Sequence, residues 1–237
     1  MNGWTIAGTS FLACGVEMVE ALTIVLAAGI ARGWHTAVTA AVWAIVILAA
    51  IVAVARPVLL WLEPLAAFKI GVGIVAAYYG LGWLRKAILR AAGRKALRDE
   101  GAIYAKQVAE LERADNRAAF TTAFNGVFFE GVEAVVIVLA LAAGNTAALP
   151  WAAGGALAAL AIVVVTGIAL HRPLERVPEN ALKFLVGTML TTFGIFWIGE
   201  GAGLHWWRDD ASIALLAAVI FGASLLSVRV LRPARDS

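Results

Sequence analysis

The sequence has little of what a water-soluble protein or a soft-metal site needs. Only 15% of its 237 residues are charged and 62% are hydrophobic, a composition that excludes a soluble globular domain. The single cysteine, Cys14, excludes an intrachain disulfide and a thiolate cluster. The three histidines, His35, His171 and His205, fall at the ends of apolar runs, so a zinc or copper site rich in imidazole is disfavoured.

Long apolar runs occupy most of the chain. Seven of them reach the length of about 20 residues that a helix needs to cross a hydrocarbon core of about 30 Å. They cover residues 9–31, 36–55, 65–84, 119–144, 148–170, 182–203 and 211–230. Because the runs lack the alternation of membrane strands, the sequence predicts an all-α membrane protein with seven transmembrane helices. No basic segment precedes the first run, so we expect it to be retained as a span.

Basic residues are distributed unevenly between these runs. If the loop between the third and fourth runs is cytoplasmic, every Lys and Arg except Arg56, Lys69 and Arg208 falls on the cytoplasmic side. This positive-inside distribution predicts an N-terminus outside and a C-terminus in the cytoplasm, in what we expect to be a bacterial inner membrane. It also explains the basic pI of about 9.3 without binding to nucleic acid.

The two halves of the chain resemble each other. Glutamates recur at an offset of 113 residues, and lysine, glycine and tryptophan recur at an offset of 114, in the pairs Glu17/Glu130, Glu20/Glu133, Lys69/Lys183, Gly73/Gly187, Gly80/Gly194 and Trp83/Trp197. We therefore predict one repeat over residues 9–86, a second over 119–204 and an extra span over 211–231. Three spans per repeat make the second repeat inverted, and inverted repeats place a substrate site near the midplane. Residues 87–118 are predicted to form a cytoplasmic amphipathic connector on the membrane surface.

Each repeat carries two glutamates inside an apolar helix. Glu17 and Glu20 lie in VEMVEALTIVLAAG, and Glu130 and Glu133 lie in FEGVEAVVIVLALAAG. Burying four charges in a membrane costs about 10 kcal/mol on the mild insertion scale, so a bound cation or shared protons must offset them. The spacing of three residues puts each pair on one helix face. A cage of up to four carboxylates suits a hard cation such as Fe³⁺, Fe²⁺, Mn²⁺, Ca²⁺ or Mg²⁺.

Other polar side chains are candidates for lining this metal site. They are Thr23, Asn125, Tyr78 and Thr192, although helical hydroxyls commonly bond to the carbonyl four residues earlier. Cys14 is either a further ligand or a buried apolar residue. Alternatively, the glutamates bind no ion and only hold neighbouring helices together through hydrogen bonds. Proton carriage is compatible with metal binding, because an arriving cation displaces protons from the same oxygens.

The glutamate motifs carry a family resemblance. EGVEAVVIVLA at 130–140 resembles the Arg-Glu-Gly-Leu-Glu signature of the high-affinity iron permease family, and EMVEALTIVLA at 17–27 is a degenerate copy. The resemblance implies iron uptake, with the four glutamates as the motif carboxylates. Val16 and Phe129 replace the motif arginine, and Met18 replaces the glycine in the first copy. The arrangement of paired acidic motifs in inverted three-span repeats is also similar to that of cation/proton exchangers. Their Glu-x-Gly-Asp motif, however, is absent from this sequence.

From these features we expect a transporter and not an enzyme. Its substrate would be a hard metal cation, iron or another divalent or trivalent metal such as manganese, moved by rocking of the two repeats in alternating access. A proton-coupled Ca²⁺ or Mn²⁺ exchanger is the alternative, and a non-transporting membrane scaffold is the third hypothesis. We expect no permanently bound cofactor. The expected partners are the lipid bilayer, the transported cation and, in exchange, protons, and a homo-oligomer is left open.

Overall fold

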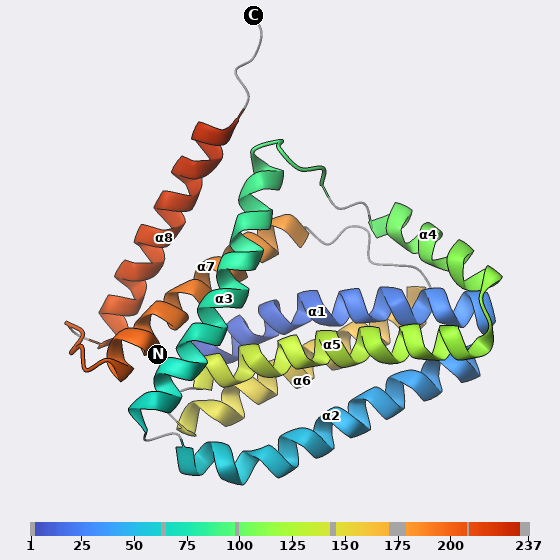
Figure 1. Cartoon of the computed structure of the whole chain (residues 1–237), viewed down its shortest axis with the longest axis horizontal. Helices are drawn as coiled ribbons and strands as arrows, with labels where there is room; N and C mark the ends of the chain where they lie inside the picture. The colour runs from blue at the N-terminus through green and yellow to red at the C-terminus, as the bar shows by residue number, and fades with distance from the viewer. Residues whose placement is uncertain are drawn as a thin grey trace, which may run out of the picture.

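The computed structural model is helical over nearly all of the residues it describes, which are 3–62, 65–97, 100–142, 146–170, 179–207 and 209–232 (Figure 1). Its long helices are α1 (Gly3–Arg32), α2 (Trp34–Leu62), α3 (Ala66–Ala91), α5 (Asn116–Ala142), α6 (Leu149–Leu170), α7 (Glu179–Gly201) and α8 (Asp209–Leu231). In the described part of the chain, seven helices are long and apolar enough to cross a membrane. The prediction of an all-α membrane protein with seven spans is confirmed.

The helices pack in two groups. In the first group, α1 lies against α5, α6 and α2, and α2 also contacts α5. In the second group, α3 packs along α7, and α8 lies against both. Figure 1 shows α1, α2, α5 and α6 running side by side while α3, α7 and α8 cross their direction. Each group therefore contains helices from both predicted repeats.

The packing pairs follow the relation expected of inverted repeats. The contact of α1 with α6 has its counterpart in α5 with α2, and the contact of α1 with α7 has its counterpart in α3 with α5. Helices α1 and α5 run antiparallel, since Cys14 contacts Ala134 while Ile24, further along α1, faces the earlier Gly126. The glutamate-bearing helices thus point in opposite directions, as the odd number of spans per repeat predicts.

Four glycines bring the backbones of α3 and α7 into contact. A Cβ atom placed on Gly73 would lie 2.8 Å from the carbonyl oxygen of Gly194, and one on Gly187 would lie 3.0 Å from that of Gly80. We call Gly73, Gly80, Gly187 and Gly194 the glycine seam. Small residues of this kind allow close approach of membrane helices.

The predicted connector contains helix α4 (Glu100–Arg113), which packs on the end of α1. Tyr104, Val108 and Leu111 join an apolar cluster with alanines of α1, α2 and α5. The Arg32 guanidinium donates to the carbonyl oxygens of Leu111 (2.9 Å), Glu112 and Ala114 at the C-terminal end of α4. The last carbonyls of a helix lack intrahelical partners, and here the arginine supplies donors to them, while the Leu111 oxygen also accepts from the Ala114 N–H (3.2 Å). The apolar face of α4 therefore rests on protein.

Candidate metal site

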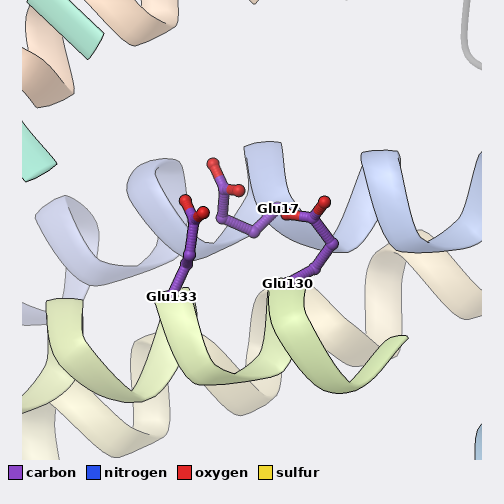
Figure 2. Close-up of side chains that lie close together, drawn as sticks. All are labelled: Glu17, Glu130 and Glu133. Atoms are coloured by element: carbon purple, nitrogen blue, oxygen red, sulfur yellow. The ribbon is translucent and has the colours of Figure 1, made fainter. Parts of the chain in front are cut away.

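Three of the four glutamates meet between α1 and α5. One carboxylate oxygen each from Glu17, Glu130 and Glu133 lies within 4.8 Å of the others. Figure 2 shows Glu17 reaching from α1 and the other two from the facing side of α5. The spacing of three residues puts Glu130 and Glu133 on one face of α5, and the antiparallel packing turns that face toward α1. We call these three residues the carboxylate cluster.

Glu17 is the most buried member of the carboxylate cluster. Its side chain is 1% exposed, whereas Glu130 and Glu133 are half-buried. Its Oε1 atom is buried and has no hydrogen-bond partner among the described residues. An unsatisfied buried acceptor costs about 1–3 kcal/mol, and more when it is charged. A cation between these carboxylates would give this oxygen the partner it lacks.

Glu20 lies outside the carboxylate cluster, although its charge acts on all three members, and its side chain pairs with a lysine of α7. Its carboxylate forms an ion pair with the Lys183 ammonium, and both residues are only 8% exposed. Lys183 also interacts electrostatically with Glu17, Glu130 and Glu133. The structure thus brings three of the predicted ligands together, whereas the fourth, Glu20, forms an ion pair with Lys183 nearby.

The charge distribution and the structure place Lys183 differently. The positive-inside pattern assigns it to the cytoplasmic loop before the sixth span, but it lies within α7 and is buried against α1. A signal was present, because Lys183 falls inside an apolar run and is the repeat partner of Lys69. A charge at such a position requires a partner, and four carboxylates were available.

The four predicted lining residues are placed as follows. Thr23 and Thr192 donate their hydroxyls to their own helices, to the carbonyl oxygens of Val19 (2.9 Å) and Thr188 (2.8 Å). Tyr78 is 75% exposed on α3, and Asn125 is exposed on α5. These placements give no reason to count any of the four as a ligand.

Two residues beside the glutamates have packing roles. The fully buried Cys14 thiol contacts the Ser10 hydroxyl (3.7 Å) and the Ala134 carbonyl oxygen (3.8 Å), as a packed residue would. A Cβ atom on Gly131, the glycine between the two glutamates of the second motif, would lie 2.5 Å from the Leu48 side chain of α2. This glycine therefore lets α2 approach α5.

A wide apolar cavity lies on another face of the same helices. Its volume is about 910 Å³, and α1, α2, α5 and α6 line it with side chains such as Met18, Leu48, Val135 and Leu160. None of its lining residues is a carboxylate, an imidazole or a thiol. It is therefore distinct from the candidate metal site.

Fold and site together define a helical integral membrane protein with buried carboxylates that could hold a metal ion. No protein-family model, curated protein or solved structure matches the chain. The resemblance to the iron permeases accordingly rests on the two glutamate motifs.

Proposed function

We propose that the chain transports a hard metal cation across a bacterial cell membrane, with iron as the first candidate and manganese as the second. The observation that carries the proposal is the buried, unpartnered Oε1 of Glu17 within the carboxylate cluster. With Glu20 included, four carboxylates lie near the Lys183 ammonium, and the Lys86 ammonium also acts on Glu133. The carboxylates outnumber these ammoniums, and a divalent or trivalent cation would offset the excess negative charge.

The ligand atoms favour hard metals over soft ones. The carboxylate cluster offers oxygen only, and the Cys14 sulfur is engaged with Ser10 and Ala134. Iron, manganese, calcium and magnesium accept all-oxygen coordination, whereas zinc and copper sites usually include imidazole or thiolate. The motif resemblance places iron first among the hard metals.

The packing suggests which parts move during transport. The glycine seam joins α3 to α7, and the carboxylate cluster joins α1 to α5, so each contact links helices of different repeats. We therefore assign the rocking motion to the two packing groups, in place of the two repeats. The carboxylate cluster belongs to one packing group and Lys183 to the other. On this proposal the site lies where the two packing groups meet.

Proton-coupled exchange of Ca²⁺ or Mn²⁺ is the second candidate. Buried carboxylates that bind a cation release protons to it, so the same site supports exchange. A scaffold without transport is less well supported. Buried carboxylates that serve only structure normally have hydrogen-bond partners, and Glu17 Oε1 has none in the described part of the chain.

Flux into proteoliposomes tests the proposal. Fe²⁺, Fe³⁺, Mn²⁺, Ca²⁺, Mg²⁺ and Zn²⁺ would be measured with and without a pH gradient. We expect Glu17→Gln to lower metal flux at least about tenfold, the lower limit for disturbing a metal ligand's surroundings. Glu110→Gln is the matched control, because Glu110 is an exposed residue of α4.

Three results would change the proposal. Full flux in Glu17→Gln would remove the carboxylate cluster from the mechanism. Flux accompanied by a proportional change in lumenal pH would promote the exchanger. The absence of any cation flux under every gradient would leave the scaffold as the best remaining hypothesis.

A further inference from the structure

Lys183 connects the two packing groups at the site. It extends from α7, and its ammonium pairs with Glu20 on α1. The same ammonium lies 5.7 Å from the centre of the Trp83 ring on α3, within the range of a cation–π contact. It also interacts electrostatically with every member of the carboxylate cluster. A single side chain thus places a positive charge beside all four glutamates.

Lys69, the repeat partner of Lys183, has a similar aromatic contact but a different carboxylate partner. Lys69 lies 6.0 Å from the ring centre of Trp197, so each lysine contacts the tryptophan of the other repeat. The carboxylate partners differ, however. Lys69 pairs with Glu200 on α7 at 2.5 Å, whereas Lys183 pairs with a glutamate of the predicted metal site.

We propose that the Lys183 ammonium is a built-in competitor of the metal: it pairs with the Glu20 carboxylate and must leave it when the cation uses this carboxylate. The inference rests on the proposed function and names a residue that sets the affinity of the site. Lys183 is a positioning residue, because it acts on the cation through Glu20.

Competition follows from the charges. A cation that uses Glu20 must break the ion pair with Lys183, so part of its binding energy is spent on displacement. The metal also brings positive charge close to the ammonium, and like charges in a low dielectric repel strongly. Arrival of the cation therefore breaks the ion pair between α7 and α1, which links occupancy of the site to the contact between the packing groups.

Equilibrium binding of Mn²⁺ to the purified full-length protein tests the proposal. Calorimetry would compare the wild type with Lys183→Gln, Lys183→Arg and Lys106→Gln, a control at an exposed lysine of α4. We expect Lys183→Gln to bind Mn²⁺ at least about tenfold more tightly, given the coupling of close charge pairs. Lys183→Arg keeps the competing charge, so it should bind within about threefold of the wild type, and Lys106→Gln should bind like the wild type.

A second comparison guards against misfolding of Lys183→Gln, which leaves Glu20 without its partner. The double variant Glu20→Gln/Lys183→Gln removes both charges of the pair and leaves the carboxylate cluster intact. It should bind Mn²⁺ more tightly than the single variant Glu20→Gln, in which Lys183 is still present. Equal affinities in this comparison would count against competition.

The outcomes separate this inference from the proposed function. If the wild type binds Mn²⁺ and Lys183→Gln binds it equally or more weakly, Lys183 is a structural or supporting charge and the inference is overturned. Binding by Lys183→Gln alone would support it in its strongest form. If no variant binds Mn²⁺ or Fe²⁺, the proposed function fails and the inference fails with it.

Discussion

Gly73 of α3 and Gly194 of α7 meet backbone to backbone, since a Cβ atom on Gly73 would lie 2.8 Å from the Gly194 carbonyl oxygen. The α3 backbone is equally close to Gly194: a Cβ atom on Gly194 would lie 2.5 Å from the Ala77 nitrogen. Backbone atoms cannot turn aside as flexible side chains can. The position of α7, and with it that of Lys183, therefore depends on the absence of side chains in the glycine seam.

Gly194→Ala should destabilise the protein. Overpacking a close contact typically costs about 1–3 kcal/mol, which exceeds the gain of about 1 kcal/mol that alanine brings to a helix. The control is Gly82→Ala, because nothing lies within 4 Å of a Cβ atom there. Thermal unfolding in detergent should show a lower midpoint for Gly194→Ala and an unchanged or higher one for Gly82→Ala. Equal shifts would mean that the helices separate at little cost.

Glu17→Gln should stabilise the empty protein while removing its response to metal. The amide relieves repulsion from Glu130 and Glu133, but it offers the cation a weaker ligand. A ligand present at a hundredfold above its dissociation constant stabilises a protein by about 2.7 kcal/mol. We expect Mn²⁺ to raise the unfolding midpoint of the wild type and to leave that of Glu17→Gln almost unchanged. A full metal-induced shift in the variant would place the ion elsewhere.

Arg32→Ala should release α4 from the end of α1. The guanidinium donates to three carbonyl oxygens around the end of this helix, and hydrogen bonds from charged groups contribute about 1.5–3 kcal/mol. Hydrogen exchange of Glu100–Arg113 should accelerate in the variant. Lys106→Ala is the control, because the exposed Lys106–Glu110 pair at 3.8 Å contributes at most about 0.5 kcal/mol. Unchanged exchange in Arg32→Ala would assign the docking to the apolar contacts.

The repeat relation predicts a role for Lys69 in the opposite-facing state. If the halves exchange roles, Lys69 leaves Glu200 and pairs with Glu133, as Lys183 pairs with Glu20 here. Lys69→Gln should then lower metal flux at least about tenfold, the effect of losing a close charge pair. Glu200→Gln removes only the pair seen here and should keep flux within about twofold. Equal losses of flux in Lys69→Gln and Glu200→Gln would mean that Lys69 acts only through its ion pair with Glu200.

The spans and the meeting of the glutamate helices could be predicted from the sequence because they depend on few properties. Hydropathy requires only composition and length, and seven apolar runs leave little choice of fold. The opposite directions of α1 and α5 follow from the odd number of spans, three, in each repeat. Glu17, Glu130 and Glu133 then meet because helical spacing fixes the face on which each lies.

The position of Glu20 could not be predicted in the same way. Glu20 shares a helix face with Glu17, but its carboxylate pairs with the Lys183 ammonium. The position of that lysine depends on how α7 crosses α1, which the sequence does not specify. Tyr78 and Thr192 are repeat partners, yet Tyr78 is 75% exposed and Thr192 is buried. Helix α8 has no counterpart in the first repeat and contacts both α3 and α7, so equivalent positions need not have equal surroundings.

The apolar cavity bears on how strongly the site can bind an ion. It adjoins α1 and α5 through residues that neighbour the glutamates, Met18 and Ala21 on one helix and Gly131 and Ala134 on the other. Its walls offer water few partners, so hydrocarbon chains suit it better. Such a filling forms a low-dielectric wall, and Coulombic attraction grows as the dielectric constant falls. The membrane itself would then act as insulation for the site, and a cation between these carboxylates would be held by fields that a water-exposed acidic cluster never develops.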